Sequence, residues 1–180
     1  MAKKIEYKKV DILLDFDFKP KDLEKFAKEL ANKMSFIDFV FETTFTKCKV
    51  RETNKGLHIY LEAIAPNQLN PVDIVVIQLA LGSDYKRELF NYRRVKDKVI
   101  TENWNILFKR KTTRDVEGNV KYESKEVENE NTKKLQKLIM QYYLDKLIGH
   151  CKEIREMKTK EFLAEKDKKY DWNDLFRFLM

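Results

Sequence analysis

The stretch that decides the fold of this chain is a short apolar segment that contains two carboxylates in alternate positions. It reads Val10-Asp11-Ile12-Leu13-Leu14-Asp15-Phe16-Asp17-Phe18. Because side chains alternate between the faces of a strand, a strand over residues 9–18 places Asp15 and Asp17 on one face and its apolar side chains on the other. Two carboxylates about 6–7 Å apart repel each other and are costly to bury. The pair therefore predicts a site for a hard divalent cation, Mg²⁺ or Mn²⁺.

The apolar residues that follow recur at helical spacing. They are Leu23, Phe26, Ala27, Leu30, Ala31 and Met34. This pattern predicts an amphipathic helix over about 20–34, with Pro20 in its first turn. Residues 36–45 are aromatic and β-rich, which favours extended structure from there.

A β-hairpin is predicted around the turn Asn54-Lys55. Its strands cover residues 46–53 and 56–64. With a two-residue loop, one face of the hairpin is polar, and its facing pairs are Arg51 with His58, Lys49 with Tyr60, and Lys47 with Glu62. The opposite face is apolar and belongs to the core.

The rest of the chain predicts mostly helices. Asn70 and Pro71 begin one helix, Gly82 ends it, and Ser83 caps the next, over about 84–95. Further strands are predicted over 104–111 and 120–127, a long helix or two over 131–168, and a short helix over 171–180.

This order of elements predicts an α+β fold. The expected core is a β-α-β-β sheet of ferredoxin or RNA-recognition type, with helices on one face, within a domain of residues 1–128. A C-terminal helical extension, residues 129–180, is expected to pack on this domain. The open face of the sheet would then carry Asp15, Asp17 and the polar face of the hairpin together.

Composition narrows the classes of partner. The chain has 180 residues, 37% of them charged, and a net charge of +7, which permits a polyanionic ligand. Its two cysteines, Cys48 and Cys151, have no metal-binding spacing and predict reduced thiols in a cytoplasmic protein. No apolar run reaches the length of a membrane span, so no membrane partner is expected.

Two motifs resemble those of the archaeo-eukaryotic primase (primase-polymerase) superfamily, small forms of which occur in mobile replicons. Leu13-Leu14-Asp15-Phe16-Asp17 is similar to the family's hydrophobic run ending in Asp-x-Asp. Gly56-Leu57-His58-Ile59-Tyr60 looks like its second motif, a small residue and, two positions later, a His at the head of a strand. The resemblance covers about residues 10–111 and implies metal-dependent nucleotidyl transfer that makes or extends a primer.

The resemblance also implies catalytic roles. Asp15 and Asp17 would hold two divalent ions, and His58 would contact the phosphates of the incoming nucleotide. Where the family's third motif has an acid, this chain has Asn91, a neutral residue that is a weaker metal ligand. The chain is therefore expected to be either an active nucleotidyltransferase or an inactive relative that binds single-stranded nucleic acid or a partner protein.

Eight further side chains are candidates for holding nucleic acid, with single-stranded DNA the expected form, or nucleotides. They are Lys49, Arg51, Tyr60, Arg87, Asn91, Arg94, Lys109 and Lys111. The first three lie on the polar hairpin face, the next three share one face of a helix, and the last two belong to a basic run.

Each of these assignments has a structural alternative. The two acids of the strand would pair with neighbouring lysines, His58 would be a satisfied structural histidine, and the arginines of helix 84–95 would pair with Glu88 and other acids nearby. Glu62 and Asp84 are the residues that would replace the missing third acid. The C-terminal helices are expected either to dimerise or to contact a replication partner.

Overall fold

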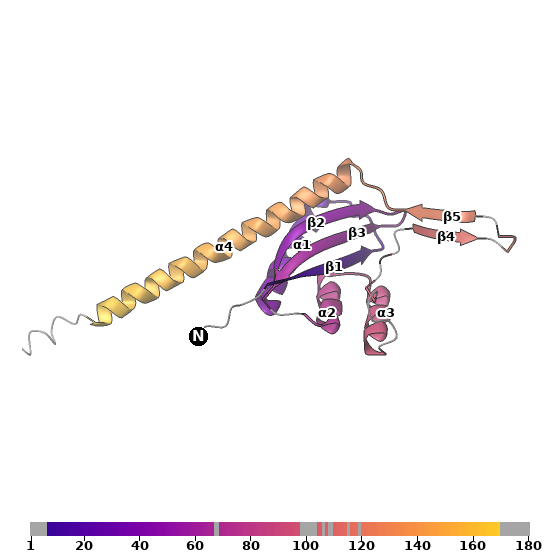
Figure 1. The fold of residues 1–180 in the computed structure, drawn as a ribbon. Coiled ribbons are helices and arrows are strands. Elements are labelled where there is room, and N and C mark those ends of the chain that lie inside the picture. The colour runs from indigo at the N-terminus through magenta and orange to yellow at the C-terminus, as the bar shows by residue number, and fades with distance from the viewer. Residues whose placement is uncertain are drawn as a thin grey trace, which may run out of the picture. The chain divides into compact units, whose positions relative to one another are not determined.

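The computed structural model describes most of the chain (Figure 1). The described residues are 7–66, 69–97, 104–105, 107, 110–114, 116–118 and 120–169. The elements are β1 (Lys8–Phe16), α1 (Leu23–Phe41), β2 (Thr44–Glu52), β3 (Leu57–Ala65), α2 (Pro71–Leu81), α3 (Tyr85–Lys96), β4 (Arg110–Arg114), β5 (Val120–Lys125) and α4 (Glu130–Lys169). The chain divides into two compact units, Met1–Tyr143 and Leu144–Met180.

The first unit is built on a three-stranded antiparallel sheet with the strand order β1-β3-β2, and β4 and β5 form a separate hairpin (Figure 1). The predicted α+β class is therefore confirmed. Of the predicted strand over 104–111, residues 106, 108 and 109 lie outside the described residues, residues 104, 105 and 107 are not in a strand, and β4 begins at Arg110. Within the described part of the chain, no fourth strand joins the sheet.

The register of the hairpin is as predicted. Arg51 faces His58, Lys49 faces Tyr60 and Lys47 faces Glu62. The Thr53 N–H donates to the Gly56 carbonyl at 2.9 Å and closes the turn. A β-bulge between Phe45 and Lys47 interrupts the regular pairing near the start of β2.

Helix α1 differs from its predicted limits at both ends. It begins at Leu23, because Asp22 is the N-cap and its side chain accepts from the Lys25 N–H at 2.9 Å. It continues to Phe41, so the residues expected to be extended after 36 are helical. The backbone of Glu42 is left-handed, with φ of 52°, and ends the helix.

The core fills one side of the sheet. Its strand residues include Ile12, Leu14, Val50, Ile59 and Leu61, which are almost fully buried. They lie opposite the apolar stripe of α1, with Leu30, Ala31, Met34 and Ile37 buried. The period-two pattern of β1 is therefore satisfied in the predicted sense, with Asp11, Leu13 and Asp15 turned to the other side.

Helices α2 and α3 begin and end at capping residues. Asn70 and Asp73 form a reciprocal capping box at the start of α2, and Gly82, with φ of 96°, ends it, as predicted. The prediction that Ser83 caps α3 is wrong. The Asp84 side chain accepts from the Arg87 N–H at 3.1 Å, and the Ser83 hydroxyl is free to bind elsewhere in the fold.

The outer edge of β1 is covered by the α2–α3 connection. The Leu13 N–H donates to Gln78 Oε1 at 2.9 Å, and the Asp15 N–H donates to the Ser83 hydroxyl at 3.0 Å. The Leu13 carbonyl accepts from Arg87 at 2.8 Å, and the Asp15 carbonyl accepts from the Asp84 N–H at 2.7 Å. These contacts use the groups that a fourth strand would need, which explains why the sheet ends at β1 here.

The edge at β2 is covered by the chain that follows β5. Glu52 and Val127 exchange two backbone hydrogen bonds of 2.8 Å, and the Phe45 N–H donates to the Tyr143 hydroxyl at 3.0 Å. Tyr143 lies on the first part of α4, is fully buried and donates to the Asp38 carboxylate. These contacts cover the two ends of the β2 edge.

The predicted long C-terminal helix is confirmed as α4. In the second unit it exposes several large apolar side chains, namely Leu144, Ile148, Ile154 and Met157. Dimerisation or partner binding through this segment stays a prediction, and the predicted helix over 171–180 lies outside the described residues. None of the described helices combines the length and the apolarity needed to cross a bilayer.

Candidate functional site

The open face of the sheet carries the polar side chains predicted for it. Lys47, Lys49 and Arg51 occupy alternate positions of β2, and His58, Tyr60 and Glu62 face them from β3. Asp15 lies opposite His58 on β1. The alternation of strand side chains, together with the turn at Asn54-Lys55, places all of them on one side.

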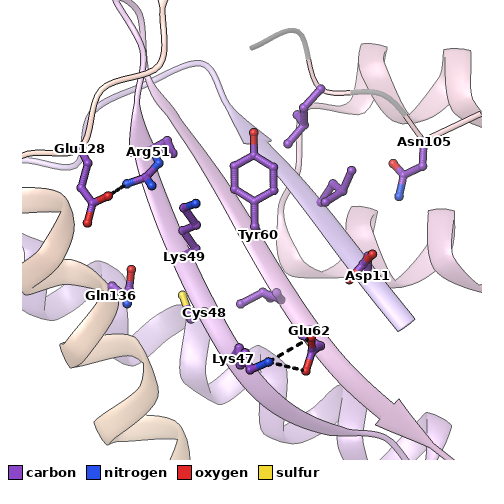
Figure 2. A pocket seen from close by; sticks show the side chains of 13 residues that line it. Asp11, Lys47, Cys48, Lys49, Arg51, Tyr60, Glu62, Asn105, Glu128 and Gln136 are labelled. Carbon is purple, nitrogen blue, oxygen red and sulfur yellow. Dashed lines mark hydrogen bonds and ion pairs between the residues drawn. The ribbon is translucent and has the colours of Figure 1, made fainter. Parts of the chain in front are cut away.

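A groove of about 1040 Å³ runs over this face (Figure 2). Its floor includes Leu13 and Tyr60, and Figure 2 shows the Tyr60 ring standing between β2 and β1. Figure 2 shows Glu128 and Gln136 on the side of β2 and Asn105 on the side of β1, and Leu107 also lines the groove. The volume lies at the upper end of the range usual for ligand sites.

The three cations along β2 differ in their pairing. Lys47 forms an ion pair of 3.2 Å with Glu62, and Arg51 pairs with Glu128. Lys49 is exposed in the groove between them and has no partner among the described residues. One cation is therefore available to an anionic ligand, and two more would become available by exchanging a carboxylate for it.

His58 lies between two carboxylates and is almost fully buried. Its Nε2 is 3.4 Å from Asp15 Oδ1, and its Nδ1 is 2.6 Å from Glu126 Oε1. Burial disfavours the charged imidazolium, but the hydrogen bonds and charges of the two acids outweigh it and raise the pKa of His58. The raised pKa favours an imidazolium that bridges β1, β3 and the segment after β5.

Tyr60 shares the same acid. Its hydroxyl donates to Glu126, while its ring lines the groove. Burial, together with the hydrogen bond and the charge of Glu126, raises the pKa of Tyr60, so it stays a neutral phenol. An aromatic ring on an open sheet face offers a stacking surface for a base.

The two acids of the predicted metal site, Asp15 and Asp17, do not share a contact in the described part of the chain. Asp15 contacts His58, whereas Asp17 follows the end of β1, is exposed and has no partner within the described ranges. No group of three or more His, Cys, Asp or Glu side chains in these ranges is arranged to hold a metal ion. Glu62 is engaged with Lys47 and Lys9, and Asp84 caps α3, so neither completes a set with the two acids.

Gly56, the small residue of the second motif, has a structural reason to be Gly. A Cβ built there would lie 1.7 Å from the Phe16 carbonyl oxygen and 2.7 Å from the Phe18 N. The hairpin turn therefore packs directly on the backbone at the end of β1. Two residues further along, the pairing of β3 with β1 places His58 opposite Asp15.

The α3 candidates belong to a buried polar network. Asn91 is fully buried and donates to Glu88 Oε2 at 3.1 Å, and Arg94 donates to Asn91 Oδ1 at 3.1 Å. Arg87 binds Glu88, and its other nitrogen donates to Asn105 Oδ1 at 2.7 Å. The shared helix face was correctly predicted, but here it points to β1 and the interior.

The remaining two candidates cannot be placed in the site. Lys109 lies outside the described residues. Lys111 is on β4, opposite Ser124 of β5, and its side chain is outside the description.

Two residues of the site were missed by the sequence reasoning. Glu126 and Glu128 follow β5 and reach His58, Tyr60 and Arg51, which lie 66 to 77 positions earlier in the chain. Their alternation around Val127, the last residue of the strand predicted over 120–127, was the available signal. Nothing in the local pattern showed which strand they would meet.

Comparisons of the chain with protein-family models, curated proteins and solved structures found no match. The assignment of function therefore depends on the geometry of the site.

Proposed function

We propose that this protein binds single-stranded nucleic acid along the open face of its sheet. The observation that carries the proposal is the groove with three cations at alternate positions of β2 and the Tyr60 ring beside them. Proteins that bind single strands without strong sequence preference combine a basic groove for the phosphates with aromatic side chains for the bases.

Lys49 is the central contact in this proposal. It is exposed, has no carboxylate partner in the described part of the chain and lies opposite Tyr60 in the register. A phosphate at Lys49 would leave an adjacent base within reach of the Tyr60 ring. The net charge of +7 would assist the approach of a polyanion from a distance.

The arrangement of the first three strands supports the same proposal by analogy of fold. The order β1-β3-β2, with α1 connecting β1 to β2, is that of a ferredoxin-like or RNA-recognition sheet over its first three strands. RNA-recognition domains bind single strands on the open sheet face through aromatic side chains. The analogy concerns architecture, so the side chains of the groove carry the argument.

Binding to a fluorescent oligothymidylate of about ten nucleotides, measured by anisotropy at several salt concentrations, tests the proposal. Replacing Lys49 by Ala should weaken binding and lower the slope of log K against log salt by about 1. Lys25→Ala on α1 removes the same charge from an exposed position outside the groove and should have little effect. Absent or salt-independent binding would contradict the proposal.

Metal-dependent nucleotidyl transfer is the second candidate function. The observation in its favour is that Asp15, His58 and the groove residues lie on one face, with Asp17 exposed at the end of β1. By themselves these side chains do not form a metal centre, and substrate phosphates would have to complete it.

Calorimetry with Mn²⁺, in the presence and absence of a nucleoside triphosphate, separates the two functions. An active enzyme should bind Mn²⁺ and extend a primer, and an Asp15→Asn/Asp17→Asn variant should lose both properties. A wild-type protein that binds the oligonucleotide but neither Mn²⁺ nor the nucleotide is a binding protein only.

A further inference from the structure

The segment between β5 and α4 crosses the edge of the sheet beside the groove. Val127 pairs with Glu52, the last residue of β2, through two backbone hydrogen bonds of 2.8 Å. Residues 126–128 are called the acidic strap below. The strap makes no other backbone pairing with the sheet among the described residues.

The strap directs two carboxylates onto the open face. Because alternate side chains of an extended segment point the same way, Glu126 and Glu128 both reach the sheet, while Val127 stays 53% exposed. Glu128 pairs with Arg51, and Glu126 binds His58 and Tyr60. Figure 2 shows Glu128 approaching Arg51 from outside the strand.

The strap therefore occupies groups that a nucleic acid would use. Arg51 and Tyr60 line the groove, and they are the cation and the ring nearest to the strap. A guanidinium binds carboxylate and phosphate with the same forked geometry, so Glu128 takes the place of a phosphate at Arg51.

We propose that the acidic strap is an autoinhibitory element that competes with nucleic-acid phosphates for Arg51 and the Tyr60 end of the groove. This inference rests on the proposed function. A bound strand replaces Glu128 at Arg51, and the strap separates from β2 as the strand occupies the full groove.

The attachment of the strap suits such an exchange. Its backbone attachment is one bridged residue pair, and the Glu128 side chain is 40% exposed. The Glu126 side chain is 13% exposed and holds the other end of the strap at His58 and Tyr60. Partly exposed ion pairs contribute little to stability, and segments with few contacts open locally at low cost. The adjoining Asn129 caps α4 and donates to Glu52 Oε2 at 2.6 Å, which anchors the downstream end.

The test compares Glu128→Gln with Glu29→Gln for binding of the same oligothymidylate. Glu29 is exposed on α1, so its replacement makes the same change in net charge away from the groove. Glu128→Gln should tighten binding about two- to fivefold, as expected for releasing one partly exposed ion pair. Glu29→Gln should change it less.

Hydrogen exchange gives an independent readout of the same event. Saturation with the oligonucleotide should speed exchange of the Val127 and Glu52 amides, because their mutual hydrogen bonds break when the strap separates. Exchange that is unchanged or slower would overturn the strap proposal, as would Glu128→Gln binding no more tightly than Glu29→Gln.

The outcomes separate this proposal from the one on which it rests. If the wild type binds and Lys49→Ala weakens binding, but Glu128→Gln does not tighten it, only the strap proposal fails. If neither the wild type nor Glu128→Gln binds the oligonucleotide, the proposed function fails and the strap proposal fails with it.

Discussion

The outer edge of β1 and the groove over β2 are built from the same kinds of side chain but differ in burial. At the β1 edge, Glu88 is fully buried and binds Gln78 at 2.6 Å, Ser83 at 2.7 Å, Asn91 and Arg87. In the groove, Lys47, Lys49 and Arg51 are at least partly open to solvent, and the carboxylates that pair with Lys47 and Arg51 are themselves partly exposed.

The difference shows how one set of residue types serves two purposes. At the β1 edge every charge and amide has a partner, so the side chains replace a missing strand and stabilise the sheet. In the groove the water-exposed cations contribute little to stability and remain able to bind a ligand. Whether a polar side chain stabilises the fold or stays available to a ligand depends on its burial and on its hydrogen-bond partners, and not on whether it is Arg or Asn.

The largest expected effect is at Glu88, the buried carboxylate at the outer edge of β1. Glu88→Ala would remove the carboxylate that the buried Arg87 binds on its own helix, and a partner from each of Gln78, Ser83 and Asn91. We expect a loss of about 3–5 kcal/mol in the free energy of unfolding, measured by urea denaturation. Glu88→Gln, which keeps the shape, should lose less. A loss below about 1 kcal/mol for the Ala variant would mean that the network is not structural.

Gly56→Ala should have the next largest effect. The new Cβ would overlap the Phe16 carbonyl oxygen, and moving the hairpin away from β1 should cost about 1–3 kcal/mol. The matched control is Gly149→Ala, because a Cβ at Gly149 on α4 meets no atom within 4 Å and should not destabilise the protein. Equal midpoints for both variants in urea would show that the close approach at Gly56 is absent.

Asp38 adds a pH-dependent test of a buried carboxyl. Burial raises its pKa to about 6 from 3.8, against the opposing hydrogen bonds from Tyr143 and Thr43. Because this pKa is raised in the folded protein, the contribution of Asp38 to stability is fully present below about pH 4 and is lost as the pH rises through about 6. The stability of Asp38→Asn relative to the wild type should therefore increase as the pH rises from about 4 to about 6, which urea midpoints at several pH values would measure. A constant difference across this range would contradict the shift.

The smallest effect is expected at Glu62, a carboxylate that lines the groove. Glu62→Ala makes the same chemical change as Glu88→Ala, but it removes the partly exposed partner of Lys47, Lys9 and Thr46. The urea midpoint should stay at the wild-type value, because solvent screens these pairs. A destabilisation approaching that of Glu88→Ala would contradict the conclusion that ion pairs in the groove contribute less to stability than the buried network at the edge of β1.

Much of the local structure was predictable from short-range patterns. The two-residue turn at Asn54-Lys55 determined the pairing of Arg51 with His58, and alternation determined which side chains share the open face. Asn70 and Gly82 marked the ends of α2, because capping and a left-handed C-cap depend on a few neighbouring atoms. The predicted end of α1 is too early because aromatic residues favour strands. In the structure Phe36 and Phe39 lie on the exposed side of the helix, and Ile37 continues its buried stripe.

The chemical character of the site was less predictable. The Asp15 and Asp17 pair indicated a metal site, but His58 is the partner that Asp15 contacts. Asn91 is predicted to hold nucleic acid or nucleotides, but the helix face it shares with Arg87 is buried against β1. In both cases the pattern along one element was correct, and the neighbour across the fold decided the role.

The sequence by itself determined the three strands of the sheet, their faces, the hairpin register and the caps of α2, since these depend on residues a few positions apart. Only the tertiary structure decided that α2 and α3 complete the edge of β1, that Glu126 and Glu128 reach the groove, and that Lys49 is left without a partner in the described chain. Those outcomes depend on contacts between segments up to 77 residues apart, which no local periodicity encodes.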